Sequence, residues 1–292
     1  MEGVDTVPNL AFASAGGATV RNRFRQFSIT LPAAQKSGVT LPLRNAPMGA
    51  SSTASSLSQA AQPLQNPPAL FRAASNSAAD LANQRSMHQL YDSMFQQLIE
   101  AIEFGFNRYR QSAGLVDVII NGPIAIGGRL SGPNLDALIM SAPSVASWTS
   151  PRAAMREAVA KGLHQQWSRL AESVKVSGLP WYPTFAAFPG PVAPPTPNVP
   201  MPFMVLSHDA GATAPSTLKA AMRSCLQGRF DYSDEFFESI ATGFDSTLQV
   251  WKATQMVTQV LGTGPVPTFA PPYVPVGTVV GGRILPGNHL IT

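Results

Sequence analysis

The sequence predicts a mainly α-helical protein that repeats one unit, a long amphipathic helix followed by an extended Pro/Gly-rich ribbon, after a long irregular N-terminal arm. Three observations predict this architecture. Apolar residues recur at helical spacing in several stretches from Met87 onward, and two of those stretches run into ribbons of similar composition. The first 86 residues, in contrast, show no sustained periodicity.

Residues 1–86 are predicted to form the extended arm. They are rich in Ser, Ala, Pro, Asn and Gln, and the stretch MGASSTASSLSQAAQPLQNPP is close to low complexity. Such a segment buries too little apolar surface to order itself, so we expect it to be extended or disordered, and if it is ordered, partners must order it. The dense basic cluster of the arm consists of Arg21, Arg23 and Arg25. We interpret it as a solvated polar tail, with contact to phosphate groups as the alternative.

Four helices are predicted after the arm, because apolar residues recur there every three or four positions. They begin near Met87, Ser150, Pro215 and Ser233. Ser150 and Ser233 are predicted N-caps, since a serine oxygen can accept a hydrogen bond from the first turn of a helix. Gly262 is expected to end the fourth helix as a C′ glycine.

An offset of 84 residues aligns the second helix and its ribbon with the fourth helix and its ribbon. Trp167 then falls on Trp251, and the Pro-Thr-Phe-Ala stretch at 183–186 falls on the same four residues at 267–270. Because one gap-free offset aligns a helix and the loop that follows it, we predict an internal duplication.

A weaker copy precedes these two. An offset of 142 residues places Tyr109 on Trp251 and aligns Gly122-Pro123 with Gly264-Pro265. The predicted organisation after the arm is therefore three helix–ribbon units, the third with an extra short helix, at residues 87–133, 134–200 and 201–292.

The two Pro/Gly-rich ribbons are predicted to run as polyproline-like segments over another surface. Proline fixes φ and lacks the N–H group that an interior strand donates, so we expect no interior strands there. Four aromatic residues of the ribbons are predicted to anchor them at packing or subunit interfaces: Trp181, Phe185, Phe269 and Tyr273.

Tyr109, Trp167 and Trp251 occupy equivalent positions in the three units. Their equivalence predicts a shared packing role, in the core or at an interface. Basic residues lie close to Tyr109 and Trp167 in the sequence, so a stacking platform for nucleic acid is the alternative interpretation.

No residue pattern indicates catalysis, a metal site or a cofactor site. The four histidines form no ligand pair of known spacing, and the single cysteine, Cys225, is predicted to be a small buried hydrophobe. Ser207, His208 and Asp209 have the residue types of a hydrolytic triad. Because neighbours in sequence cannot stack into the required relay, a polar turn is the preferred interpretation. We therefore predict a non-enzymatic protein without metal or cofactor.

The composition predicts partners. Charged residues make up 12% of the chain, about half the roughly 25% usual for soluble domains, and the net charge is +4. A monomer with so few charges lacks solubilising groups, so we expect it to cover surface with copies of itself or with other proteins. The most apolar stretch, LVDVIINGPIAIGG, is too short to span a bilayer, and no transmembrane insertion is expected.

The stretches VLGTGPVPTF and IINGPIAIGG, with the helix ends that lead into them, resemble repeats in structural proteins of tailed bacteriophages and related contractile particles. In those proteins short helical units end in Gly-Pro ribbons. The resemblance implies a tail, baseplate or capsid-associated subunit that binds itself and other particle proteins. It implies a location in the virion or phage-like particle, and in the cytoplasm of the producing cell before assembly.

Two other functions stay open at this point. One is an amphipathic protein that associates with a membrane surface, although the polar faces of the helices lack the Lys/Arg richness typical of such anchors. The other is a packaging protein that contacts nucleic acid through the basic N-terminal arm.

Overall fold

The computed structural model describes residues 16–29, 67–228, 230, 232–267 and 276–285. The chain divides into two compact units, one of residues 1–20 and 96–292 and the other of residues 21–95. The described backbone of the second unit is helical, since it comprises parts of α1 (Gly17–Ile29) and α5 (Pro67–Ser112). The first unit contains a six-stranded sheet together with helices, so the architecture is mixed α/β.

The prediction of a mainly α protein is therefore confirmed only in part: helix predominates, at 55% of the chain against 22% strand, but the antiparallel sheet makes the fold mixed α/β. The strands of the large sheet are β1 (Gly114–Asn121), β2 (Ile124–Ser131), β3 (Val176–Pro180), β5 (Val192–Thr196), β8 (Gly262–Pro265) and β10 (Gly282–Ile284). They lie in the order β3-β2-β1-β10-β8-β5, and every neighbouring pair is antiparallel. Two small sheets pair β4 (Phe188–Pro189) with β9 (Val276–Gly277), and β6 (Met201–Pro202) with β7 (Met256–Val257).

Proline and glycine decide where each ribbon strand lies in the sheet. β3 ends at Pro180 and β5 contains Pro194 and Pro195, and these two strands form the edges, where proline is tolerated. The interior strands β8 and β10 instead carry glycine at Gly262 and Gly282. We expected no ribbon residue in an interior strand. This is wrong for the glycine-rich strands β8 and β10. The proline-rich strands β3 and β5 lie at the edges, as expected.

The first predicted ribbon, IINGPIAIGG, is a β-hairpin. β1 pairs with β2 along its length, from Gly114 opposite Ser131 to Asn121 opposite Ile124. The two-residue loop between the strands is Gly122-Pro123, and Gly122 has φ +60°. Glycine adopts this left-handed conformation without steric cost, and a type II′ hairpin turn requires it at the first loop position.

Helices form at all four predicted places. Besides α5 they are α8 (Arg152–Ser173), α9 (Pro215–Cys225) and α10 (Ser233–Thr254). Short helical segments complete the first unit: α6 (Leu135–Met140), α7 (Pro143–Ala146), η2 (Pro183–Ala186), η3 (Phe203–Val205) and η4 (Ala210–Thr213).

The predicted ends of the helices need correction. The N-cap residues are Pro151 for α8 and Tyr232 for α10, and neither makes a side-chain capping bond. Ser150 and Ser233 are therefore not N-caps. Helix α10 ends at Thr254, so Gly262 lies well beyond it, within β8.

The predicted arm also contains helical residues. α1 lies within it, and α5 begins at Pro67 rather than near Met87. In the first unit, Val20 of α1 is fully buried, and a Cβ atom built on Gly243 of α10 would lie 2.2 Å from its Cγ2 atom. Because Gly243 has no side chain, the side chain of Val20 fits against the backbone of α10. Packing, rather than a long apolar stripe, accounts for this part of α1.

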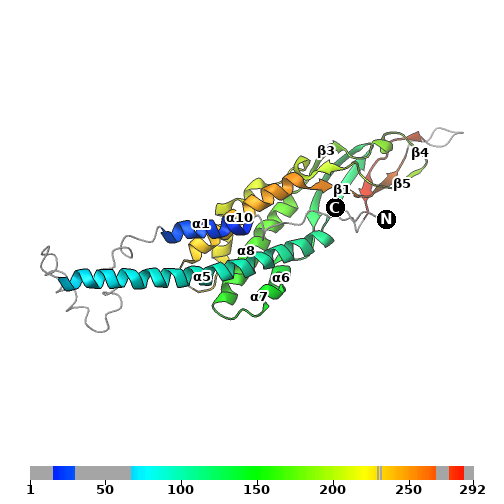
Figure 1. Ribbon diagram of the computed structural model, residues 1–292. Coiled ribbons are helices and arrows are strands. Elements are labelled where there is room, and N and C mark those ends of the chain that lie inside the picture. The colour runs from blue at the N-terminus through cyan, green and yellow to red at the C-terminus, as the bar shows by residue number, and fades with distance from the viewer. Residues whose placement is uncertain (1–15, 30–66, 229, 231, 268–275, 286–292) are drawn as a thin grey trace, which may run out of the picture. The chain divides into compact units, whose positions relative to one another are not determined.

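Helices α8 and α10 both lead into the sheet (Figure 1), and they meet where the ring of Trp167 lies 6.5 Å from that of Trp251. α8 packs on β2, α6 and α9, and α9 also packs on α10. Val118, Ile120 and Ala125 of the β1–β2 hairpin are at most 1% exposed and form the covered face of the sheet. The helix–ribbon units therefore share one sheet.

Tyr182 packs tightly against β8 on this covered face. Its side chain is fully buried, and its hydroxyl donates a 2.8 Å hydrogen bond to the carbonyl of Val260. A Cβ atom built on Gly262 would lie 2.7 Å from the Tyr182 ring and 2.7 Å from Cδ1 of Ile120. Glycine is required at position 262 because the ring and the strand approach each other so closely.

We expect Gly262→Ala to lower the free energy of unfolding by about 2–3 kcal/mol, because the added methyl group overpacks a buried site. Urea unfolding of the full chain measures this. Gly281→Ala is the comparison, since its Cβ would meet no atom within 4 Å and only its φ of +65° opposes the change. That variant should lose roughly 1 kcal/mol. Equal losses in the two variants would contradict the close-approach explanation.

Candidate functional site

The residues with hydrolytic side chains, at 206–211, form a structural turn. The hydroxyl of Ser207 donates to the carbonyl of Lys175 at 3.3 Å, and Nδ1 of His208 lies 3.0 Å from the carbonyl of Leu206. The carboxylate of Asp209 pairs with Arg169 at 2.8 Å and accepts the N–H of Gly211 at 2.9 Å. These contacts are structural, and they support the interpretation of the segment as a polar turn.

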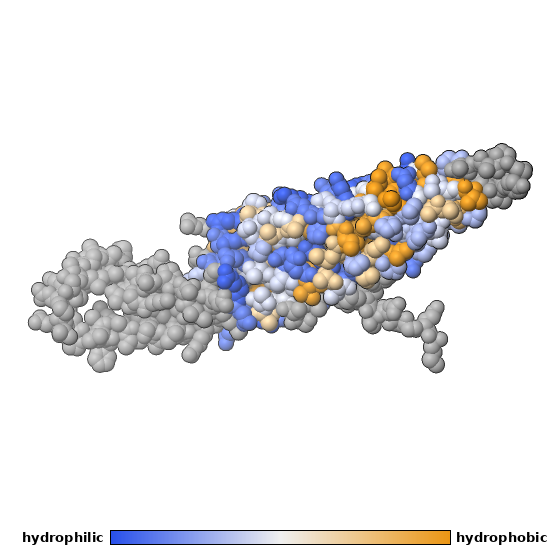
Figure 2. All heavy atoms as spheres, turned by 90° about the horizontal axis from the view of Figure 1, so that it is seen from above, coloured by the Kyte–Doolittle hydropathy of each residue, from blue (hydrophilic) through white to orange (hydrophobic). Residues whose placement is uncertain are grey.

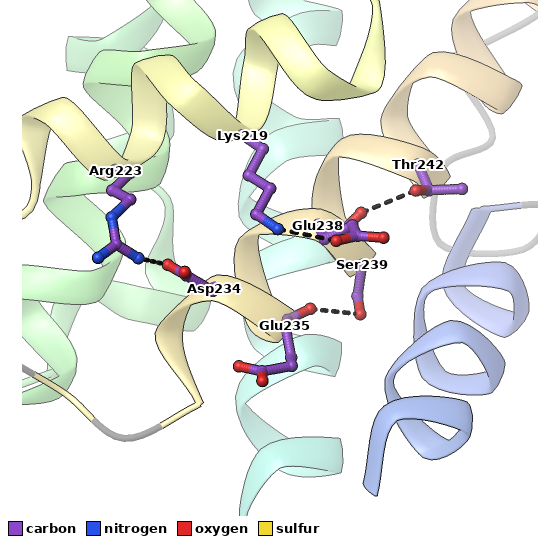
Figure 3. Close-up of polar contacts among 7 residues, drawn as sticks. All are labelled: Lys219, Arg223, Asp234, Glu235, Glu238, Ser239 and Thr242. Atoms are coloured by element: carbon purple, nitrogen blue, oxygen red, sulfur yellow. Dashed lines mark hydrogen bonds and ion pairs between the residues drawn. The ribbon is translucent and has the colours of Figure 1, made fainter. Parts of the chain in front are cut away.

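The acidic residues at the start of α10 join it to α9. Figure 3 shows Lys219 and Arg223 of α9 reaching Glu238 and Asp234 of α10. The Lys219 Nζ to Glu238 Oε2 distance is 2.8 Å, and both side chains are about one-third exposed or less. The sequence suggested only first-turn charges that suit the helix dipole. In the structure, Asp234 and Glu238 also form the ion pairs that join α10 to α9, which is a structural role.

The described residues contain neither a cluster of metal-binding side chains nor a membrane-spanning helix. Within that part of the chain, no group of three or more His, Cys, Asp or Glu side chains could hold a metal ion. Across the same residues, none of the helices combines the length and the apolar character needed to cross a bilayer. Cys225 is half-buried rather than buried, which corrects the prediction for it.

Tyr109, Trp167 and Trp251 meet in one buried aromatic cluster inside the first unit. Their side chains are at most 5% exposed, and they come from α5, α8 and α10. Phe106 lies at the centre, with its ring centroid 4.6 Å from that of Trp167 and 5.6 Å from that of Trp251. The rings of Tyr109 and Trp167 meet edge to face at 5.5 Å. The three equivalent residues thus form core, and their burial leaves no platform on which a base could stack.

Two of the four predicted ribbon anchors lie in the described part of the chain. Trp181 and Phe185 are fully buried, and the ring of Phe185 stacks on Tyr182 at 5.1 Å. They hold the segment after β3 against the chain itself. Phe269 and Tyr273 lie outside the described residues.

The predicted phosphate-contacting arginines lie on a helix. Arg21 and Arg23 are both half-buried on α1, and each has an interaction partner. Positions two residues apart lie roughly 200° apart around a helix, so these two arginines point away from each other. The side chain of Arg25 lies outside the described part. Positions 21 and 25 are one helical turn apart and share a side of α1, whereas position 23 lies on the other side, so the three arginines do not share one face.

Two cations are buried near the helix ends beside the aromatic cluster. Arg110 follows Tyr109 in the last turn of α5 and is 6% exposed, and Lys252 follows Trp251 in the last turn of α10 and is 2% exposed. Burial lowers the pKa of both side chains, and nearby Asp245 partly opposes the shift at Lys252. The negative end of a helix dipole favours a cation, which gives both residues a structural explanation.

The best candidate for a functional site is the outer face of the six-stranded sheet, which we call the open sheet face. Cross-strand partners point to the same side of a sheet. Ile119 is opposite both Ile126 and Arg283, and Arg283 is opposite Thr263. The open sheet face is defined by Ile119, Ile124, Ile126, Val192, Thr263 and Arg283.

The four aliphatic residues of the open sheet face are between 41% and 59% exposed. Isolated exposed aliphatic residues are common, whereas contiguous apolar surface marks an interaction site. Figure 2 shows hydrophobic residues gathered over the end of the molecule that carries the sheet. The sequence interpretation did not single out these residues, although the period-two alternation in LVDVIIN and IAIGGRLS was a signal for them.

A shallow groove of about 470 Å³ lies between β1 and β10. β1 pairs with β10 only at Ile119 and Ile120, whereas it pairs with β2 from end to end. The groove forms where the first half of β1 and the end of β10 separate, and it is lined by residues 115–119 and 283–285. Its lining is aliphatic apart from Asp117 and Arg283, a combination that suits recognition of a protein surface.

Comparison with protein-family models, curated proteins and solved structures gave no match.

We expect Phe106→Ala to lower the free energy of unfolding by about 3–5 kcal/mol, because it opens a cavity between three helices. Urea unfolding followed by tryptophan fluorescence measures the change, since Trp167 and Trp251 both touch the ring. Phe188→Ala, at a half-buried phenylalanine in β4, is the control and should cost much less. A loss at Phe106 no larger than that of the control would contradict the central role of its ring.

We expect Lys252→Met to raise the free energy of unfolding at pH 7 by about 1 kcal/mol, because it removes a buried charge. The folded-state pKa of Lys252 lies below its ordinary 10.5, so the unfolded chain binds the proton more tightly. Wild-type stability should therefore rise as the pH passes from the folded-state pKa toward 10.5, and the advantage of the variant should shrink there.

Urea unfolding of both proteins at pH 7 and at about pH 10 measures this difference. Lys175→Met replaces an exposed lysine and serves as the control for removing a lysine charge that is not buried. An advantage of Lys252→Met that does not change with pH would contradict the explanation.

Proposed function

We propose that the chain is a non-enzymatic structural subunit of a large protein assembly, specifically a tail, baseplate or capsid-associated component of a phage or phage-like particle. It acts by binding copies of itself and other particle proteins. Its location is the particle, and before assembly the cytoplasm of the producing cell. The open sheet face is the observation that carries the proposal.

Three features support an assembly role. The open sheet face presents half-exposed isoleucine and valine side chains on a chain with only 12% charged residues. Burying such a face against another protein removes apolar surface from water, at roughly 25 cal/mol per Å². In addition, the described residues with catalytic chemistry, such as Asp209, serve structural contacts.

The alternatives have less support. The apolar stripe of α10, including Phe237, Phe244 and Leu248, is at most 1% exposed, so it is already used inside the chain. A membrane-surface function would need such a stripe to face lipid. Contact with nucleic acid through the arm would need a shared basic face, which Arg21 and Arg23 do not form on α1.

Sedimentation and light-scattering measurements on the purified full chain test the assembly role. We expect a mass that rises with concentration to multiples of 30.9 kDa and to species larger than a dimer. A single 30.9 kDa species at every concentration would contradict the proposal.

Mass spectrometry of particles purified from the producing cell on a density gradient tests the particle assignment. We expect the chain in the particle band, at a constant ratio to the other particle proteins. Its recovery only in the soluble fraction would contradict the particle assignment.

A further inference from the structure

We propose that the open sheet face packs against the same face of a second copy of the chain, with the two copies related by a two-fold axis. The inference rests on the proposed function and specifies the surface through which self-association occurs. Four features of the described chain carry it: the apolar face, the blocked sheet edges, the area of the face and its charges.

The apolar residues extend across the sheet rather than along one strand. Ile124 is opposite Pro180 of the edge strand β3, Ile119 is central on β1, and Val192 lies on the other edge strand, β5. Val280, which is 49% exposed and donates its N–H to the carbonyl of Pro265, adds apolar surface beside β8. A second sheet could therefore find side chains to pack against across the whole width.

The edges of the sheet do not favour the alternative, in which a second copy would extend the sheet sideways. Pro180 in β3 and the pair Pro194-Pro195 in β5 lack the N–H groups that a regular ladder needs. Gly178 of β3, with φ +73°, departs further from strand geometry. Natural sheets use such features to prevent edge-to-edge pairing. Association face to face remains available to this sheet.

The area fits a modest dimer interface. Six strands spaced about 4.8 Å apart, with about five residues each at roughly 3.3 Å per residue, give a projected area near 450 Å². The accessible area is larger than this projection because side chains stand out from the sheet, but the face remains smaller than the roughly 800 Å² that each partner buries in a standard interface. We therefore expect a dimer with a dissociation constant on the order of micromolar, strengthened by further contacts in an assembly.

A two-fold axis can set one charge of the open sheet face near an opposite charge of the second copy, although Asp117 already accepts from Arg129 of its own chain at 3.0 Å. β1 and β10 are the two central strands, so a two-fold axis that runs between them along the strand direction places β1 of each copy over β10 of the other. Asp117 is two residues from Ile119, which pairs with Arg283. The axis thus brings Asp117 of one copy within about 7 Å, along the strand, of Arg283 of the other. A long arginine side chain can span that separation. The axis also brings the two Arg283 Cα atoms to about 11 Å from each other. In the proposed packing, Asp117 therefore offsets the repulsion between these arginines.

Substitutions on the open sheet face test the proposal. We expect Ile119→Glu, and separately Ile126→Glu, to weaken self-association of the full chain at least 100-fold, because each would bury a carboxylate in the interface. Val250→Glu is the matched control, since Val250 is 62% exposed on α10, away from the sheet, and should leave association unchanged. Analytical ultracentrifugation gives the association constants, and circular dichroism with urea unfolding checks that each variant folds.

Cross-linking tests the geometry with a smaller change. In the proposed packing, the two Cα atoms at position 119 lie about 11 Å apart, given sheets roughly 10 Å apart and strands 4.8 Å apart. Ile119→Cys in a Cys225→Ser background should form a covalent dimer with a short bismaleimide reagent. Val250→Cys in the same background should not. Equal cross-linking of the two variants would contradict the two-fold packing.

The possible outcomes separate the inference from the proposed function. If the wild type assembles and the variants on the open sheet face do not, both are supported. If those variants assemble like the wild type, the open sheet face is not the self-association surface, whereas the assembly role stands. If Ile119→Glu loses binding to another particle protein while self-association is unchanged, the occupant is that protein, and the two-fold packing is overturned.

Two further outcomes bear on the wild type itself. If it stops at a dimer that Ile119→Glu breaks, the packing stands and the large assembly is contradicted. A wild type that stays monomeric at every concentration contradicts both.

Discussion

The contact of three long helices at Phe106 is the constraint on which the rest of the first unit depends. Its ring lies 4.6 Å from Trp167 of α8 and 5.6 Å from Trp251 of α10, while Phe106 itself belongs to α5. Each of these helices leads into strands of one sheet, so the positions of the helices determine where β1, β3 and β8 begin. Helices α5, α8 and α10 all contribute to one aromatic cluster. For this reason we expect that none of them would keep its core if it were separated from the others.

The same arrangement explains why one face of the sheet stays open. The helices and the segment around Tyr182 lie on the side of Ile120, which is fully buried, and Ile119 on the adjacent position is 47% exposed. A chain that acted alone would be more soluble with charged residues at such positions. Apart from Asp117, Arg129 and Arg283, this part of the sheet is apolar or weakly polar. The pattern is typical of a surface that another protein covers.

The sequence predicted the helices of the first unit better than its strands, because helical spacing is a local signal. The apolar positions that place α8 and α10 are three or four residues apart, and both helices were expected. The sheet instead joins residues as distant as Ile119 and Arg283. The role of Gly262 was ambiguous for the same reason. Its position in the sequence fits the end of a helix. Only the structure shows that it lies in a strand, where the Tyr182 ring approaches the backbone too closely for a side chain. The Gly122-Pro123 turn was a local signal for the hairpin, since apolar alternation flanks it, and it could have been recognised.

The candidate site could be predicted only in part. When both faces of a strand are apolar, the local sequence pattern does not show which face the core covers. In β1, Val118 and Ile120 point to one side and Ile119 to the other, and no feature of the strand itself indicates which side the helices cover. The helix layer makes that choice through contacts between segments far apart in the chain. Once it is made, the isoleucine on the uncovered side packs only against its cross-strand neighbours and stays 47% exposed. An apolar residue on a solvent-facing strand position is therefore better explained by a partner than by the fold. The buried tryptophans belong to the core, and the open sheet face is the candidate site.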